Sequence, residues 1–146
     1  MIVVGVESAD TSDDALTWAA AEARLRGATL RAVHAWRYVP SQTTADQAFS
    51  GAMPVDTVDL LNLERDVAER VLHDAVASVA GDVPVETRLV EDSASSALVE
   101  ASKEADMVVV GSHGRGRIAS ALLGSVSRHV AQHASCPVVI VRPKSD

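Results

Sequence analysis

The sequence predicts an α/β fold in which helices cover both faces of a parallel sheet. Short apolar or alternating runs take turns with segments of helical periodicity along the whole chain, and this order is typical of parallel strands joined by crossover helices. The chain has 146 residues, which fits one domain with a substantial core. Its single cysteine, Cys136, excludes an internal disulfide and favours a reducing compartment. We therefore expect one domain over residues 1–146.

The first part of the chain contains two predicted strands with one helix between them. Ile2 to Val6 is a short apolar run that contains a glycine, which indicates a buried strand leading into a turn. Asp10 to Asp14 supplies N-cap side chains for the following helix, and Gly27 fits its C-terminal end. Thr29 to Trp36 is the second predicted strand. Tyr38 to Thr57 lacks periodicity, and we expect a long loop there.

The remaining chain continues the alternation of helices and strands. Gly81 follows an apolar helical stripe, and Pro137 precedes the last apolar run. The predicted elements are a helix bearing Leu60, Leu63, Val67, Val71 and Val79, a strand Val83–Val90, a helix capped by Asp92 or Ser93, a strand Met107–Val110, a helix Ala119–Ala134 and a strand Val138–Val141.

Charge is distributed unevenly. The net charge of -7 argues against general binding of nucleic acids or anionic membranes. No Asp or Glu occurs from Met107 to Ser145, and this locally basic stretch predicts a bound anion. It contains Arg115, Arg117, Arg128, Arg142 and Lys144. No run approaches the roughly 18 apolar residues that a membrane span needs, so we expect a cytoplasmic protein.

The stretch GSHGRGRIASALLGSVS, residues 111 to 127, is the strongest motif. A P-loop is excluded because Arg117 and Ile118 stand where that motif needs Lys and Ser or Thr. A dinucleotide fingerprint over Gly114 to Ala119 lacks the acid that should follow about 20 residues later. The adjacent pair Ser112–His113 suggests a serine nucleophile activated by a histidine. Neighbouring residues on an extended loop, however, do not readily supply the geometry of a catalytic Ser–His pair.

The third pattern, G-x2-G-x9-G-[ST], fits Gly111, Gly114, Gly124 and Ser125. Glycines let backbone amides approach an anion closely, and successive turn amides form an anion-binding nest. With this motif, the chain resembles the universal stress protein family over essentially its whole length. The resemblance extends to VVGV, VHAW, MVVVGSHGRG, LLGSVS and CPVVIV.

The resemblance implies a Rossmann-like fold of the adenine nucleotide alpha hydrolase type, with strand order 3-2-1-4-5. It also implies that ATP binds, with Mg²⁺ held through the phosphates rather than by protein ligands. Gly5, Val6 and Glu7 would contact the nucleoside, although the family usually has Asp-Gly-Ser where this chain has Glu7-Ser8-Ala9. The backbone of Ala35 would meet the adenine edge.

The same resemblance implies two groups of phosphate contacts. One is the glycine loop, and the other is the small-residue stretch about ten residues later. The first group comprises Gly111, Ser112, His113, Gly114, Arg115, Gly116 and Arg117, and the second comprises Gly124, Ser125, Val126 and Ser127.

We therefore expect an ATP-binding module for stress response or signalling, with no assigned catalytic residue. A slow ATPase or phosphotransferase is the alternative, but the sequence offers no evident general base and no acidic pair for catalytic magnesium. A protein that has lost nucleotide and acts through protein contacts is a third reading. With the implied strand order, Val138–Val141 forms a sheet edge, so we expect a homodimer through this strand.

Overall fold

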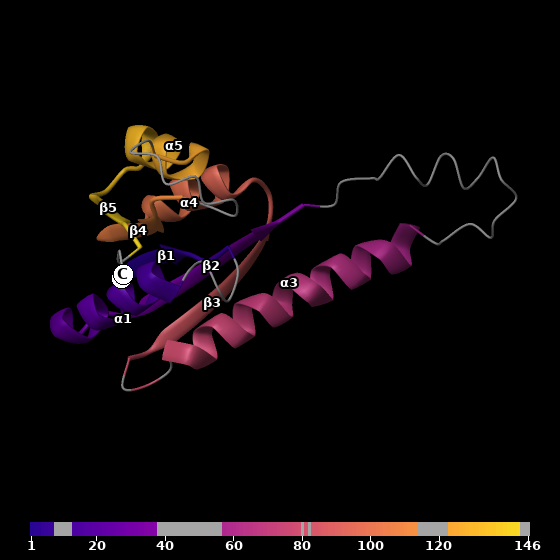
Figure 1. Cartoon of the computed structure of the whole chain (residues 1–146), viewed down its shortest axis with the longest axis horizontal. Coiled ribbons are helices and arrows are strands. Elements are labelled where there is room, and N and C mark those ends of the chain that lie inside the picture. The colour runs from indigo at the N-terminus through magenta and orange to yellow at the C-terminus, as the bar shows by residue number, and fades with distance from the viewer. Residues whose placement is uncertain (8–12, 38–56, 80, 82, 114–122, 144–146) are drawn as a thin grey trace, which may run out of the picture.

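A computed structural model describes residues 1–7, 13–37, 57–79, 81, 83–113 and 123–143 of the chain. Five parallel strands form one sheet in the order β3-β2-β1-β4-β5, as predicted (Figure 1). The strands are β1 (Ile2–Gly5), β2 (Leu30–Trp36), β3 (Val85–Glu91), β4 (Met107–Gly111) and β5 (Val138–Val141). The helices are α1 (Asp13–Arg26), α3 (Thr57–Val79), α4 (Ala94–Ser102) and α5 (Ser125–His133).

Two hydrophobic clusters lie on opposite faces of the sheet. Val3 and Val4 are adjacent in β1, and neither side chain is exposed to solvent, because each faces a different cluster. Helices α1 and α3 cover the face that contains Val4, and α4 and α5 cover the face that contains Val3. Burial on both faces explains why the central strands are almost uninterrupted apolar runs.

Local turn chemistry sets two helix ends as predicted. Gly27 follows α1 with a φ of 59°, and its amide and that of Ala28 donate to the carbonyls of Arg24 and Ala23. This is the left-handed helix end that favours glycine. At the start of α4, the Ser93 hydroxyl accepts a hydrogen bond from the Ser96 amide at 3.2 Å.

The predicted helix Ala119–Ala134 is wrong at its start. Residues 114–122 lie outside the described part, and α5 begins only at Ser125. Gly124 is the N-cap in extended conformation, with φ -63° and ψ 165°. Its amide donates to the Ser112 carbonyl at 2.8 Å. This long-range bond, which periodicity cannot reveal, holds the helix start on the end of β4.

Helix α3 confirms the predicted stripe as helical, but its N-terminal half is not core. Leu63 and Val67 are 59% and 48% exposed, because this half extends beyond the sheet (Figure 1). The helix begins at Thr57, the last residue of the expected loop, and the loop itself falls on residues 38–56, outside the described part. No helix within the described ranges is long and apolar enough to cross a membrane.

Candidate functional site

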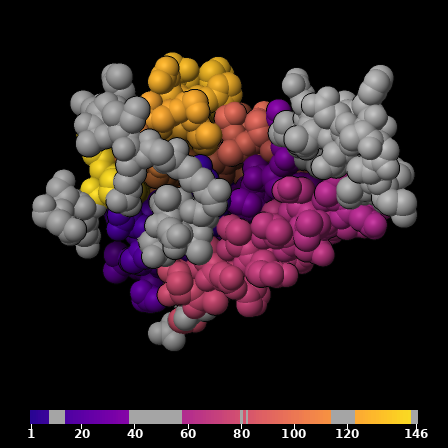
Figure 2. Space-filling model, turned by 45° about the vertical axis from the view of Figure 1, so that its right-hand side comes forward, coloured from indigo at the N-terminus to yellow at the C-terminus, as the bar shows by residue number. Residues whose placement is uncertain are grey.

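A cleft of about 710 Å³ lies at the carboxyl ends of β1, β2 and β4, where parallel α/β sheets commonly bind ligands. Helix α3 walls one side, and the first turns of α4 and α5 line the other. In the space-filling view, purple atoms of the β2 region lie in a depression between magenta α3 and the orange helices (Figure 2). The sheet thus supplies the floor and the helices the walls.

Most of the residues predicted for the site line this one cleft, although they come from distant parts of the chain. They are Gly5, Val6, Glu7, Ala35, Gly111, His113, Gly124, Ser125, Val126 and Ser127. Ser112 is 2% exposed and is not among the lining residues. Gly114, Arg115, Gly116 and Arg117 lie outside the described residues.

Sequence reasoning missed the wall formed by α3. Glu64, Val67, Ala68 and Val71 line the cleft from this helix, and Arg37 does so from the end of β2. The apolar stripe of α3 was visible in the sequence. Its middle part, with Val67 and Val71, faces the cleft rather than the core, which only the position of the helix relative to the sheet reveals.

One end of the cleft is built around the Ser112 carbonyl. It accepts hydrogen bonds from the Gly124 amide at 2.8 Å and from the Ser127 hydroxyl at 3.2 Å. A Cβ on Gly124 would lie 3.3 Å from the Ser112 oxygen and 3.4 Å from His113 Cα, so a glycine suits this close approach. Ser125 is exposed at the first turn of α5, where amides and the helix dipole favour anions.

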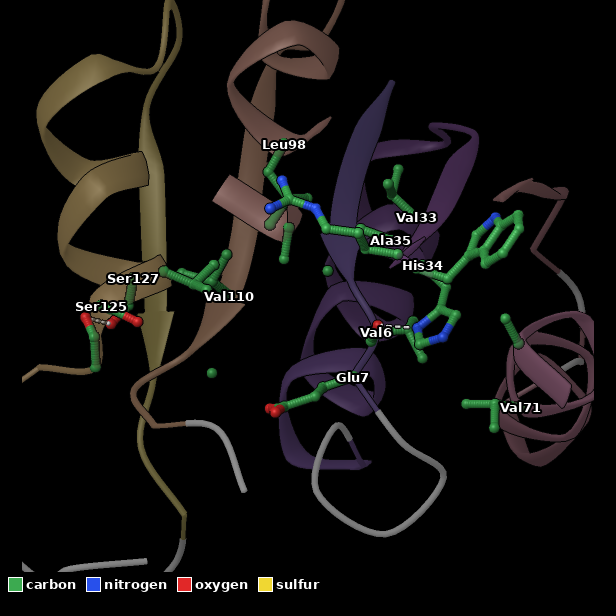
Figure 3. Close-up of a pocket in the computed structure, with 18 of the residues that line it drawn as sticks. Val6, Glu7, Val33, His34, Ala35, Val71, Leu98, Val110, Ser125 and Ser127 are labelled. Carbon is green, nitrogen blue, oxygen red and sulfur yellow. Dashed lines mark hydrogen bonds between the residues drawn. The ribbon is translucent and has the colours of Figure 1, made fainter. Parts of the chain in front are cut away.

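The opposite end is organised around Val6. Its amide donates to the Val33 carbonyl at 2.8 Å, and its carbonyl lies 2.7 Å from His34 Nδ1. The Glu7 side chain is exposed and extends toward the α5 side of the cleft (Figure 3). A Cβ on Gly5 would lie 2.9 Å from a Leu98 methyl, so the glycine lets β1 and α4 pack closely beneath the cleft.

Charged groups in the described cleft are few. Arg37 Nη2 lies 3.7 Å from Asp92 Oδ1 in an exposed ion pair. Such a pair contributes little to stability in water. No group of three or more His, Cys, Asp or Glu residues within the described ranges is placed to hold a metal ion. Away from the cleft, burial raises the pKa of the Cys136 thiol, which disfavours the reactive thiolate.

The pair Ser112–His113 corrects one expectation. The Ser112 hydroxyl lies 3.0 Å from His113 Nδ1, so these neighbours do form the Ser–His contact that an extended loop was expected not to supply. The serine is nevertheless 2% exposed and does not line the cleft. Burial of the hydroxyl, rather than the geometry of the pair, therefore argues against nucleophilic catalysis by Ser112.

Comparison with known proteins identifies relatives over the whole chain. The model of the universal stress protein family matches residues 1–142. The universal stress protein Rv2624c of Mycobacterium tuberculosis is 35% identical over 146 residues, covering 99% of this chain and 49% of the relative. This chain thus spans about half the length of the curated relatives that it matches.

Two solved structures combine the same fold with a bound nucleotide. A universal stress protein in complex with cAMP is 31% identical, has a TM-score of 0.59 and is matched over 96% of this chain and 94% of its own. The universal stress protein of Archaeoglobus fulgidus in complex with dAMP is 27% identical, with a TM-score of 0.63 over 95% and 94% of the two chains.

Proposed function

The chain belongs to the universal stress protein family, and we propose that its cleft binds an adenine nucleotide, with ATP and Mg²⁺ as the ligands of a stress-response signalling module. The observation that carries the proposal is the cleft itself, which collects residues from both ends of the chain at the carboxyl edge of the sheet. The relatives solved with cAMP and dAMP support the adenine nucleotide class.

In this proposal the nucleoside lies at the Val6 end of the cleft. The backbones of Gly5, Val6 and Ala35 contact the base, and the carboxylate of Glu7 accepts a hydrogen bond from the ribose. Glu7 is one methylene longer than the usual aspartate. Its exposed side chain extends toward α5 (Figure 3), the direction in which a ribose would connect the base to its phosphates.

The phosphates lie at the α5 end. The amides of Ser125 and Val126 and the Ser125 hydroxyl supply neutral donors there, and the helix dipole adds to the attraction. We assign the remaining contacts to Gly111, His113 and the segment from Gly114 to Arg117, with Arg115 and Arg117 facing phosphate charge, and no longer include the buried Ser112. Magnesium is bound through the phosphates. We propose binding rather than turnover. Phosphoryl transfer needs a group that positions the attacking nucleophile, and the sequence offers no evident general base for this task.

Calorimetric titration of the chain with ATP, AMP and adenosine, with and without Mg²⁺, tests this proposal. Ser125→Ala should weaken the affinity for ATP about two- to tenfold, because it removes one hydrogen bond to the phosphates. It should leave the affinity for adenosine unchanged. Ser78→Ala is the matched control, since Ser78 is exposed on α3 and its hydroxyl bonds, among the described residues, only to the Ala75 carbonyl. Its affinities should equal those of the native chain.

The outcomes separate the competing functions. If the native chain binds neither ATP nor AMP, the nucleotide proposal fails and the protein-interaction alternative gains. If Ser125→Ala weakens the binding of adenosine as much as that of ATP, the assignment of the phosphates to the α5 end of the cleft is wrong. Release of inorganic phosphate over many turnovers by the purified chain would support the slow ATPase instead.

A further inference from the structure

The tautomer of His34 is fixed by its environment. His34 lies in β2, is 9% exposed and lines the cleft. Its Nδ1 atom is 2.7 Å from the Val6 carbonyl oxygen. A carbonyl oxygen can only accept a hydrogen bond, so Nδ1 must carry the proton. In the neutral ring, Nε2 then holds a lone pair and acts as an acceptor.

That acceptor has no partner in the protein among the residues described. The contact with Val6 is the ring's one hydrogen bond there. Nε2 of His34 is not fully buried. Among the described residues, the one fully buried side-chain nitrogen or oxygen that lacks a hydrogen-bond partner is Nε2 of His113. The ring lies between Val6 and Val71 of α3 (Figure 3), both of which line the cleft.

We propose that His34 is the residue by which this cleft selects 6-aminopurines over 6-oxopurines. The inference rests on the proposed function, since it concerns the base of the same nucleotide. The exocyclic amino group of adenine donates a hydrogen bond that Nε2 accepts. A 6-oxo group presents a second acceptor to Nε2, so no hydrogen bond forms between the two atoms.

The two ring nitrogens have separate roles. Nδ1 orients the peptide between Val6 and Glu7, so His34 is a positioning residue for the proposed ribose contact. Nε2 reads the base. Substitution can separate these roles, because the amide of Asn projects about as far as Nδ1 and the amide of Gln about as far as Nε2. His34→Asn keeps a donor for the Val6 carbonyl, whereas His34→Gln keeps an acceptor near the base.

The test compares AMP with IMP, which differ at the 6-position, by calorimetry at mildly alkaline pH, where free imidazole is neutral. The native chain should prefer AMP by about 10- to 100-fold, the penalty for leaving a desolvated acceptor unpaired. His34→Asn should bind both nucleotides equally, within a factor of about two. His34→Gln should retain a preference for AMP while binding both more weakly. His73→Asn, an exposed histidine on α3, is the matched control and should behave as the native chain.

Nitrogen NMR of the native chain provides a readout that needs no variant to fold. The His34 ring should show a protonated Nδ1 and an unprotonated Nε2, and AMP but not IMP should shift the Nε2 resonance. Equal affinity of the native chain for AMP and IMP, or an unchanged ratio in His34→Asn, overturns the role of His34 and leaves nucleotide binding intact. Failure of both nucleotides to bind overturns the proposed function as well.

Discussion

Ser125 and Ser127 are two residues apart in α5 and have different environments. Ser125 is exposed at the cleft, whereas Ser127 is 2% exposed. The Ser127 hydroxyl lies 3.2 Å from the Ser112 carbonyl oxygen and 3.1 Å from that of Gly124, and it can donate to either. It therefore fastens the first turn of α5 to the end of β4. The family resemblance assigned both serines to phosphate binding. In the structure the Ser127 hydroxyl holds α5 in place, whereas the Ser125 hydroxyl does not take part in these two hydrogen bonds.

Ser127→Ala should lower the free energy of unfolding by about 1 kcal/mol, because it removes one buried hydrogen bond. The loss stays modest because the Gly124 amide still donates to the Ser112 carbonyl. Denaturant unfolding of Ser127→Ala and Ser125→Ala measures the difference. Ser125→Ala should unfold as the native chain does. Equal destabilisation by the two substitutions would contradict the division of labour between these serines.

At the scale of elements, the sequence predicted what local chemistry determines. Strand and helix order, the Ser93 cap and the Gly27 helix end depend on neighbouring residues, and all are confirmed. The start of α5 depends on a bond between Gly124 and Ser112, twelve positions apart. Helical periodicity carries no information about such a bond, so the predicted helix was too long at its N-terminus.

Helix α3 also shows what periodicity cannot predict. Its apolar stripe predicts a helix and does not say what covers each part of it. Leu72 and Ala75 lie in the core, whereas Leu63 is 59% exposed and Val71 faces the cleft. Which part becomes core depends on where the sheet ends, and that is a property of the assembled fold.

The end of α1 offers a test at this scale. A Cβ on Gly27 would meet no atom within 4 Å, but its φ is +59°, a conformation that disfavours other residues. Gly27→Ala should therefore cost about 1 kcal/mol through backbone strain alone, and Gly27→Asn should cost less. Gly81→Ala is the control, because Gly81 has no such φ and its nearest neighbour is the end of the Arg24 side chain. Thermal unfolding of the three variants measures these costs.

For the molecule as a whole, the sequence indicated the motif but not the shape of the site. The glycine and serine spacing named Gly111, Gly124 and Ser125, and Glu7 came from the family resemblance. The described structure gathers these residues around one cleft. The α3 wall and the position of the His34 ring arise from packing between segments that are distant in sequence, and no motif encodes them.

The two edges of the sheet differ in a way that bears on assembly. Strand β3 carries Glu86, Arg88 and Glu91, and such charges discourage pairing with another strand, whereas β5 is the uncharged run VVIV. The carbonyl of Pro137 accepts a hydrogen bond from the amide of Val108 in β4 at 3.0 Å, and that of Val141 accepts one from the Ser112 amide just after β4 at 2.8 Å. Backbone groups of alternate residues in a strand point to opposite sides, so those of Val138 and Ile140 are directed to the open edge.

This geometry predicts how the proposed homodimer can be broken without unfolding the chain. Ile140→Pro removes an amide that faces the open edge, where proline is tolerated, so the variant should sediment as a monomer at micromolar concentration with the β4–β5 ladder intact. Val139→Pro is the matched control, because it removes an amide directed at β4 and should destabilise the fold by more than about 1 kcal/mol. A native chain that sediments as a monomer, or an Ile140→Pro variant that remains a dimer, would show that β5 is not the interface. Loss of association in Ile140→Pro with unchanged nucleotide affinity would further show that the cleft works within a single chain.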